Sequence, residues 1–276
     1  MKLGPFQTSA VTAADLDALS GKSLPRRPLR RDGTITHGTL ALFDFASQFG
    51  RPGVSPLVQN TPMANLVEGG SAALATPVQT VAGITYAGGG VQFALASNQF
   101  YGFIDLGDIT PAVGLMITVW FRSSDAGDNG FNTRLMGIKG LFYTSMNISD
   151  GIHPTVYEVV SANASDTTVQ SADVLAAMAD GQLHQLSHWF EPRPGGKYRV
   201  VTFLDRVKVY TGAEYTFATQ ANPTKTYIGN EGAQTITGRF YRVRVDQVSA
   251  AMMTAEDLIA ADWDANIGRL AALPGL

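Results

Sequence analysis

The sequence predicts an all-β protein: a two-sheet antiparallel sandwich with an extended N-terminal arm and a short C-terminal helix. From Leu40 onward, short segments of alternating apolar and polar residues recur, and turn residues separate them. The 29 glycines and 13 prolines suit many tight turns, and 45% hydrophobic residues can fill a core. A capping sequence at Thr254 introduces the closing helix.

The predicted strands form one series, which we place in a single domain of residues 40–276. They span residues 40–45, 90–95, 101–106, 115–122, 134–139, 142–147, 155–160, 182–191, 198–203, 207–210, 225–228 and 238–245. Residues 50–85 are rich in glycine, proline, alanine and threonine, so loops and short edge strands are expected there.

Composition argues against two classes of partner. The formal net charge is −3, which gives no indication of nucleic-acid binding. No apolar stretch reaches the length of about 18 residues that a membrane span needs, so no membrane insertion is expected. The chain has no cysteine, and no apolar run of signal-peptide length follows Lys2. We therefore expect synthesis in a cytoplasm, and release only by lysis or inside a particle.

Residues 1–39 differ from the rest and form a predicted docking arm. Thr12 to Asp15 resembles a capping box and favours a short helix. Residues 22–31 contain two prolines, which favour an extended chain, and five basic residues: Lys22, Arg26, Arg27, Arg30 and Arg31. Residues 1–38 carry a net charge of +3 and the remainder −6. The arm is either a solvated leader or a segment that docks on a partner subunit, and we favour docking.

Seven short motifs follow one another along residues 40–262. They are Gly90-Val-Gln-Phe93, Gly102-Phe-Ile-Asp-Leu106, Met116-Ile-Thr-Val-Trp-Phe121, Asp180-Gly-Gln-Leu-His184, Phe203-Leu-Asp-Arg206, Ile228-Gly229, and Thr237 to Val245 with the helix after Met253. In this order they resemble the concanavalin A-like lectin/glucanase family, including its laminin G-like domains. No single motif is specific, so the resemblance depends on their order. It implies a jelly-roll sandwich of the carbohydrate-binding type.

Two positions depart from the family's pattern. Leu183 stands where the family has tryptophan, which a core position tolerates. Arg206 stands where the hairpin turn has glycine, so we expect that turn to have a different geometry.

The carboxylates do not match glycoside hydrolysis. Glycosidases of this fold place carboxylates two residues apart on one strand, so that they share a face. Glu158 has only valines as same-face neighbours, and Glu191, Glu214 and Glu231 stand alone near turns. We therefore expect no enzymatic activity.

His184 and His188 are four residues apart, the spacing of the two histidines in a zinc-protease motif. That motif needs a helix and a glutamate after the first histidine, whereas Gln185 follows here in a predicted strand. Cross-strand packing is the better explanation.

Two candidate ligand sites remain. Asp125, Asp128 and Asn129 offer oxygen ligands in a glycine-rich loop, which is either a polar turn or a calcium site of the kind that laminin G-like domains carry on rim loops. No other cofactor is expected. Trp189, near a strand end, is the candidate for stacking on a glycan, whereas Trp120 is expected in the core.

Together these features favour a non-enzymatic structural protein of a tailed-bacteriophage virion, at the tail tip, baseplate, fibre or capsid surface. The missing cysteine, the 16% of charged residues, the basic arm and the lack of catalytic carboxylates all favour this interpretation. The expected partners are other virion proteins, copies of the same chain and host surface glycans, which a multivalent particle binds with avidity. The alternative is an exported bacterial glycan-binding module.

Overall fold

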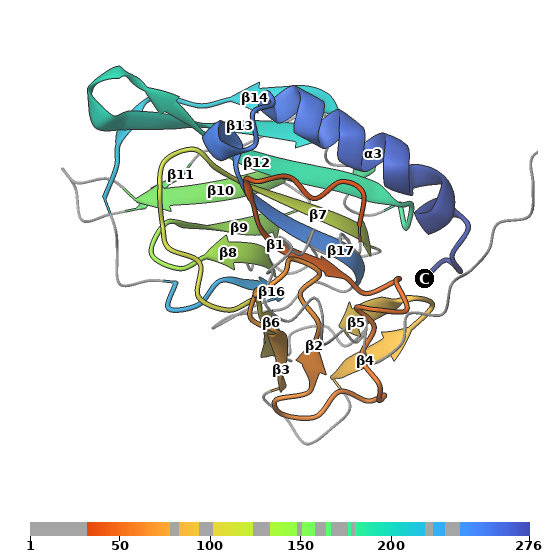
Figure 1. Cartoon of the computed structure of the whole chain (residues 1–276). Helices are drawn as coiled ribbons and strands as arrows, with labels where there is room; N and C mark the ends of the chain where they lie inside the picture. The colour runs from red at the N-terminus through yellow and green to blue at the C-terminus, as the bar shows by residue number, and fades with distance from the viewer. Residues whose placement is uncertain are drawn as a thin grey trace, which may run out of the picture.

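The computed structural model describes residues 32–77, 83–93, 102–123, 133–147, 151–157, 164–166, 176–177, 180–218, 223–229 and 238–276. Their strands form two antiparallel sheets, and an α-helix of 17 residues follows the last strand (Figure 1). No helix within these residues has the length and hydropathy needed to cross a membrane. The predicted two-sheet antiparallel sandwich with a C-terminal helix is therefore confirmed.

The first sheet, sheet A, contains the strands that lie nearest the helix. They are β1 (Thr39–Asp44), β4 (Ile84–Ala87), β5 (Gly90–Phe93), β7 (Leu115–Ser123), β12 (His184–Arg193), β13 (Lys197–Leu204), β14 (Val207–Thr211), β15 (Tyr215–Thr216) and β17 (Gly238–Gln247). Their order is β14–β13–β12–β7–β17–β5–β4, with β1 also paired to β17 and β15 to β13. The central strands β7, β12 and β17 are those with the longest predicted alternation.

The second sheet, sheet B, closes the other side of the sandwich. Its strands are β2 (Pro62–Met63), β3 (Ala73–Pro77), β6 (Gly102–Asp105), β8 (Thr133–Ile138), β9 (Phe142–Asn147), β10 (Gly151–Tyr157), β11 (Ala164–Asp166) and β16 (Tyr227–Gly229). Their order is β11–β10–β9–β8–β16–β6–β3–β2. The short strands β2 and β3 lie in residues 50–85, where short edge strands were expected.

Strand β7 is buried on both faces, which explains its almost continuously apolar sequence. On one face, Ile117, Val119 and Phe121 join the main core between the two sheets. On the other face, Met116 and Trp120 belong to two smaller apolar clusters beneath the helix. Sheet A therefore has a second covered face, and this face carries the polar groups described below.

Helix α3 (Ala255–Ala271) covers this outer face of sheet A (Figure 1). It begins as predicted, because the side chain of Thr254 accepts a hydrogen bond from Asp257 N over 3.1 Å. Its Trp263 stacks on Trp120, with ring centroids 5.1 Å apart, and Leu183 packs beside them. Trp120 is fully buried, as expected, and Leu183 is half-buried in place of the family's tryptophan.

The turn between β13 and β14 corrects one expectation. Asp205 and Arg206 have φ values of 49° and 70°, so both adopt the left-handed conformation of a tight hairpin turn. The different geometry expected from Arg206 is therefore wrong. Contacts support this backbone: Asp205 Oδ1 accepts from Gln185 N over 2.8 Å, and Arg206 pairs with Asp264 at 2.9 Å while lying over Trp263.

Candidate functional site

A layer of charged side chains lies between helix α3 and sheet A. Its members, which we call the ionic layer, are Arg242, Arg244, Arg269, Asp32, Asp44, Asp246 and Asp262. Strand β17 creates it by alternation: Val243 and Val245 enter the main core, whereas the alternating residues Arg242, Arg244 and Asp246 lie on the helix side. The ionic layer joins β17, β1, α3 and the chain before β1.

Arg242 lies at the centre of this layer and is fully buried. Its Nε donates to Asp262 Oδ1 over 2.9 Å, and its Nη1 donates to Asp32 Oδ2 at 2.7 Å and Asp44 Oδ2 at 2.8 Å. Burial alone lowers the pKa of the guanidinium, but attraction to Asp262 and Asp32 outweighs burial and raises it. The cation therefore stays charged, with carboxylates from three separate parts of the chain around it.

Asp32 anchors the start of the described chain to the sandwich. Its Oδ1 accepts from Thr34 N over 2.8 Å, and Thr34 Oγ1 accepts from Arg242 Nη2 over 2.8 Å. Burial raises the pKa of Asp32, but the charge and hydrogen bonds of Arg242 and the bonds from Thr34 outweigh burial and lower it to about 2. The root of the predicted arm is thus a fixed point on the sandwich.

Asp262 holds helix α3 on the sheet. Besides Arg242, it accepts hydrogen bonds from Trp120 Nε1 over 2.7 Å and from Gln185 Nε2 over 3.1 Å. Asn266 Nδ2, on the helix itself, is a fourth donor over 3.2 Å. The three donors from sheet A fix both the rotation and the height of the helix. This role of Asp262 was not predicted from the sequence, although the Arg242-Val-Arg-Val-Asp246 pattern of β17 indicates that charged side chains face a covered surface.

Arg244 and Asp246 form a second buried pair beside Arg242. Arg244 Nη2 donates to Asp246 Oδ1 over 2.9 Å, and Thr39 Oγ1 donates to the same oxygen over 2.8 Å. Burial raises the pKa of Asp246, and the charge and hydrogen bond of Arg244 oppose that rise without cancelling it. This pair binds the first residue of β1 to the end of β17.

His188 and His184 have different surroundings, although both lie on β12. His188 is buried in the core, where its Nδ1 lies 2.9 Å from Oγ1 of its cross-strand partner Thr202, and its ring packs against Phe142. Burial lowers the pKa of His188 to about 3, so the imidazole is neutral. The predicted cross-strand packing is therefore confirmed for His188.

His184 instead lies between two carboxylates near the end of the sandwich. Its Nδ1 is 2.7 Å from Asp205 Oδ2 and its Nε2 is 3.2 Å from Asp180 Oδ1. Burial lowers the pKa of His184, but the hydrogen bonds and charges of Asp205 and Asp180 outweigh burial and raise it. Both ring nitrogens of His184 thus have a carboxylate partner. Among the described residues, no group of three or more His, Cys, Asp or Glu side chains is placed to hold a metal ion.

Trp189, the candidate for stacking on a glycan, is half-buried on the helix side of β12. It packs against the apolar cluster of Met116, Val201 and the first residues of α3. Its Nε1 is buried and has no hydrogen-bond partner among the described residues. One face of the indole is therefore used by the fold, and stacking of a sugar on the rest stays a prediction.

The remaining predicted site residues lie outside the described ranges. These are the calcium candidates Asp125, Asp128 and Asn129 and the basic arm residues Lys22, Arg26, Arg27, Arg30 and Arg31. Calcium binding and docking by the arm therefore stay predictions.

Comparison with known proteins supports the fold. No protein-family model and no curated protein matches the chain. The chain is similar to Trypanosoma rangeli sialidase, with a TM-score of 0.50 and 11% identity over 87% of this chain, which spans 34% of that enzyme. It is also similar to domain 4 of AbnA, an extracellular arabinanase from Geobacillus stearothermophilus solved with arabinotriose: the TM-score is 0.50 and the identity 12%, over 86% of this chain and 100% of that domain.

A third similar structure is the receptor-binding domain of botulinum neurotoxin type G. Its TM-score is 0.52 with 9% identity, over 82% of this chain and 51% of that one. At such identities the likeness is one of fold: a β-sandwich of the architecture described above.

Proposed function

We propose that the chain is a non-catalytic structural protein of a tailed-bacteriophage virion, docked by its N-terminal arm and presenting a glycan-binding sandwich. The observation that carries this proposal is the attachment of Asp32 to Arg242, 2.7 Å apart. The basic residues immediately before Asp32 start from a rigid point, so a partner that binds them also fixes the position of the sandwich. The expected partners are other virion proteins and copies of the same chain.

The environment of the buried carboxylates supports a structural role for them rather than a catalytic one. Each buried aspartate of the described chain is paired with an arginine: Asp44 and Asp262 with Arg242, and Asp246 with Arg244. At the C-terminal end of β12, Glu191 pairs with Arg199, and Arg193 pairs with Glu214 at 2.9 Å. In most families, glycoside hydrolysis uses one carboxylic acid of raised pKa and one free carboxylate beside the substrate. The paired aspartates beneath α3 instead stabilise the fold.

The fold itself supports a carbohydrate ligand. Domain 4 of AbnA, solved with arabinotriose, has this layering over its whole length. In the proposed role, host glycans are bound weakly by each sandwich and tightly by the assembled particle. The calcium loop of Asp125, Asp128 and Asn129 belongs to the same proposal.

Removal of residues 1–31 tests the docking role. The truncated chain keeps Asp32 and the ionic layer, so we expect it to fold but to be absent from purified particles. If the truncated chain joins particles as the full chain does, the docking role is wrong. Folding is checked by circular dichroism, so that loss of incorporation cannot be attributed to loss of structure.

A glycan array tests the second half of the proposal. The full chain is presented as a multimer, because single-site binding is expected to be weak. Binding to one glycan class supports adhesion, whereas no binding leaves a purely architectural role.

An exported bacterial glycan-binding module is the second candidate function. The observation that favours it is the likeness to all of AbnA domain 4, a domain of an extracellular enzyme. In that case the truncated chain binds glycans as well as the full chain does, and no assembly depends on residues 1–31.

A further inference from the structure

An apolar and acidic surface lies where the chain enters helix α3. Met252 is 89% exposed, Met253 38% and Leu40 42%. Glu256 and Asp257 follow in the first turn of α3, are exposed, and have no ion-pair partner among the described residues. We call these five residues the Met252 surface. Gly38, two residues before Leu40, lies against Ala251, the residue before Met252: a Cβ on Gly38 would come within 2.6 Å of Ala251 N, and Gly38 O accepts from Gln247 N over 2.7 Å.

The fold gives no reason for methionine at position 252. Its φ is 57°, a left-handed conformation that glycine or asparagine adopts at lower cost. Its side chain buries almost nothing within the described chain, so it does not offset that strain. Flexible methionine side chains are favoured at surfaces that bind other proteins. Strain together with apolar exposure indicates a contact made with another chain.

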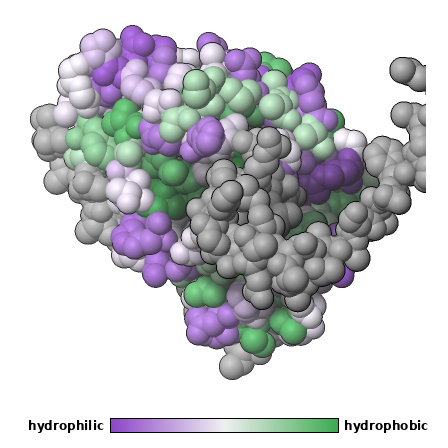
Figure 2. Space-filling model, viewed as in Figure 1, coloured by the Kyte–Doolittle hydropathy of each residue, from purple (hydrophilic) through white to green (hydrophobic). Residues whose placement is uncertain are grey.

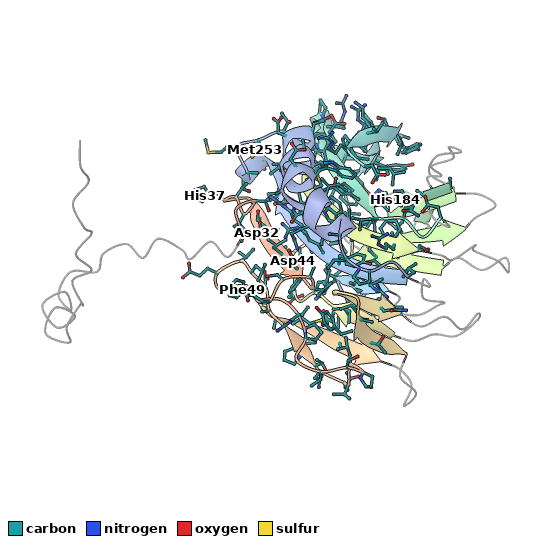
Figure 3. All side chains as sticks on the ribbon, turned by 90° about the vertical axis from the view of Figure 1, so that its right-hand side faces the viewer. Asp32, His37, Asp44, Phe49, His184 and Met253 are labelled. Atoms are coloured by element: carbon teal, nitrogen blue, oxygen red, sulfur yellow. The ribbon has the colours of Figure 1, made fainter. Side chains whose placement is uncertain are left out.

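The same side of the molecule holds the root of the arm. Figure 3 shows Asp32, His37, Phe49 and Met253 on one side of the sandwich, away from His184. On the face seen in Figure 2, α3 carries hydrophilic and weakly hydrophobic residues side by side. Because Glu256 and Asp257 are acidic and the exposed Met252, Met253 and Leu40 are apolar, a ligand for the Met252 surface needs both cations and apolar side chains.

Residues 22–31 of this chain have the required chemistry. They alternate Leu24 and Leu29 with prolines and with five basic side chains. Residues 1–31 hold six basic and two acidic residues, which gives a net charge of +4. Because the whole chain has a net charge of −3, residues 32–276 carry −7. The leucines match the exposed methionines, and the arginines match Glu256 and Asp257.

We propose that residues 22–31 of one copy bind the Met252 surface of a neighbouring copy. This inference rests on the proposed docking role of the arm and names its receptor. A neighbouring copy is favoured because Asp32 is held at Arg242, and the chain runs from there toward Ala251 at Gly38. In the segment of residues 32–38, Gly38 is the end that lies beside Ala251 and the Met252 surface, and Asp32 is the other end. Residues 22–31 therefore join the sandwich at the end that is farther from that surface.

The proposed contact joins two different surfaces, so it is heterologous. Repetition of a heterologous contact produces a closed ring or an open helical array. Both are arrangements in which many copies are presented together, as the proposed function requires.

The test is sedimentation velocity of the full chain and of two charge-reversed variants, over a range of concentration and salt. One variant is Arg26→Glu with Arg27→Glu, and the other is Glu256→Lys with Asp257→Lys. Wild type is expected to self-associate. Each variant is expected to associate more weakly, by a factor of at least about ten. An equimolar mixture of the two variants is expected to recover association, because each supplies the charge that the other has reversed.

Two further variants guard against changes in folding. Met252→Asn suits the left-handed backbone, so it is expected to fold normally and still to weaken association. Glu68→Lys reverses an exposed charge on the loop between β2 and β3, and is expected to associate like wild type.

Three results overturn the inference: a wild type that stays monomeric, variants that associate like wild type, or a mixture that stays dissociated. A monomeric wild type whose residues 22–31 are protected from protease would mean that the arm binds its own chain. If self-association fails in this way while removal of residues 1–31 still prevents particle incorporation, the docking role holds and the receptor is another virion protein.

Discussion

Asp262 on helix α3 and Arg242 on strand β17 share a hydrogen bond of 2.9 Å between Oδ1 and Nε, and neither side chain reaches solvent. This pair lies outside the main core, in the layer between the helix and the sheet. Because Arg242 also binds Asp32, the helix and the root of the arm are attached to the same cation. Any change that moves one of them is expected to affect the other.

Replacement of Asp262 by alanine is expected to loosen the helix. Trp120, Gln185 and Arg242 each lose an acceptor, and Arg242 becomes a buried cation with weaker compensation. The expected cost is about 3–5 kcal/mol in the free energy of unfolding, measured with urea. Asp264→Ala on the same helix is the control: its pair with Arg206 is exposed, so its cost is expected to stay below about 1 kcal/mol. Equal costs for the two variants would contradict this role of Asp262.

Asp32→Asn is expected to remove a contribution to stability that is present at neutral pH and lost in acid. The native pKa of Asp32, about 2, is below its ordinary value of 3.8, so the carboxylate stabilises the fold above pH 3.8. This contribution decreases as pH falls through about 2. We expect the variant to be less stable by about 1–2 kcal/mol at pH 7, after allowance for solvent screening, and the difference to shrink below pH 3.8 and to vanish below about pH 2. Urea unfolding at a series of pH values measures both, and a difference independent of pH would count against the Asp32–Arg242 ion pair.

His188→Leu is expected to flatten the dependence of stability on pH. The native pKa of His188 is about 3 against an ordinary 6.5, so between these values the unfolded chain binds a proton that the native chain does not. Stability therefore falls as pH drops below 6.5, with a slope that approaches about 1.4 kcal/mol per pH unit from this residue alone. The leucine variant lacks that contribution. Thr202→Val, which removes the hydrogen bond but keeps the imidazole, is expected to retain the slope.

The strands could be predicted because their signal is local. In β7 and β17, alternation and β-branched residues identify the strand without reference to any other part of the chain. The helix start was also local, since Thr254 and Asp257 form its cap. The order of these local signals was enough to indicate a sandwich.

The ionic layer could not be predicted in the same way. Arg242 meets Asp32 across 210 residues of sequence and Asp262 across 20, and many other acidic residues were equally available. Only the packing of α3 on sheet A selects among them. The left-handed Arg206 was missed for a related reason, because its support comes from Asp264 and Trp263 on the distant helix.

Two glycines near helix α3 give a final prediction with opposite signs. A Cβ atom on Gly38 would collide with the carbonyl oxygen of Gln247 and come within 2.6 Å of Ala251 N, both of them backbone atoms. Gly38→Ala is therefore expected to push residues 32–38 away from the start of α3 and to cost about 2–3 kcal/mol. A Cβ on Gly268, in the exposed interior of α3, would meet nothing within 4 Å. Gly268→Ala is expected to stabilise the protein by about 1 kcal/mol, because alanine favours the helix over glycine. Thermal unfolding of both variants measures the difference, and a neutral Gly38→Ala would mean that the arm root is not packed against the helix start.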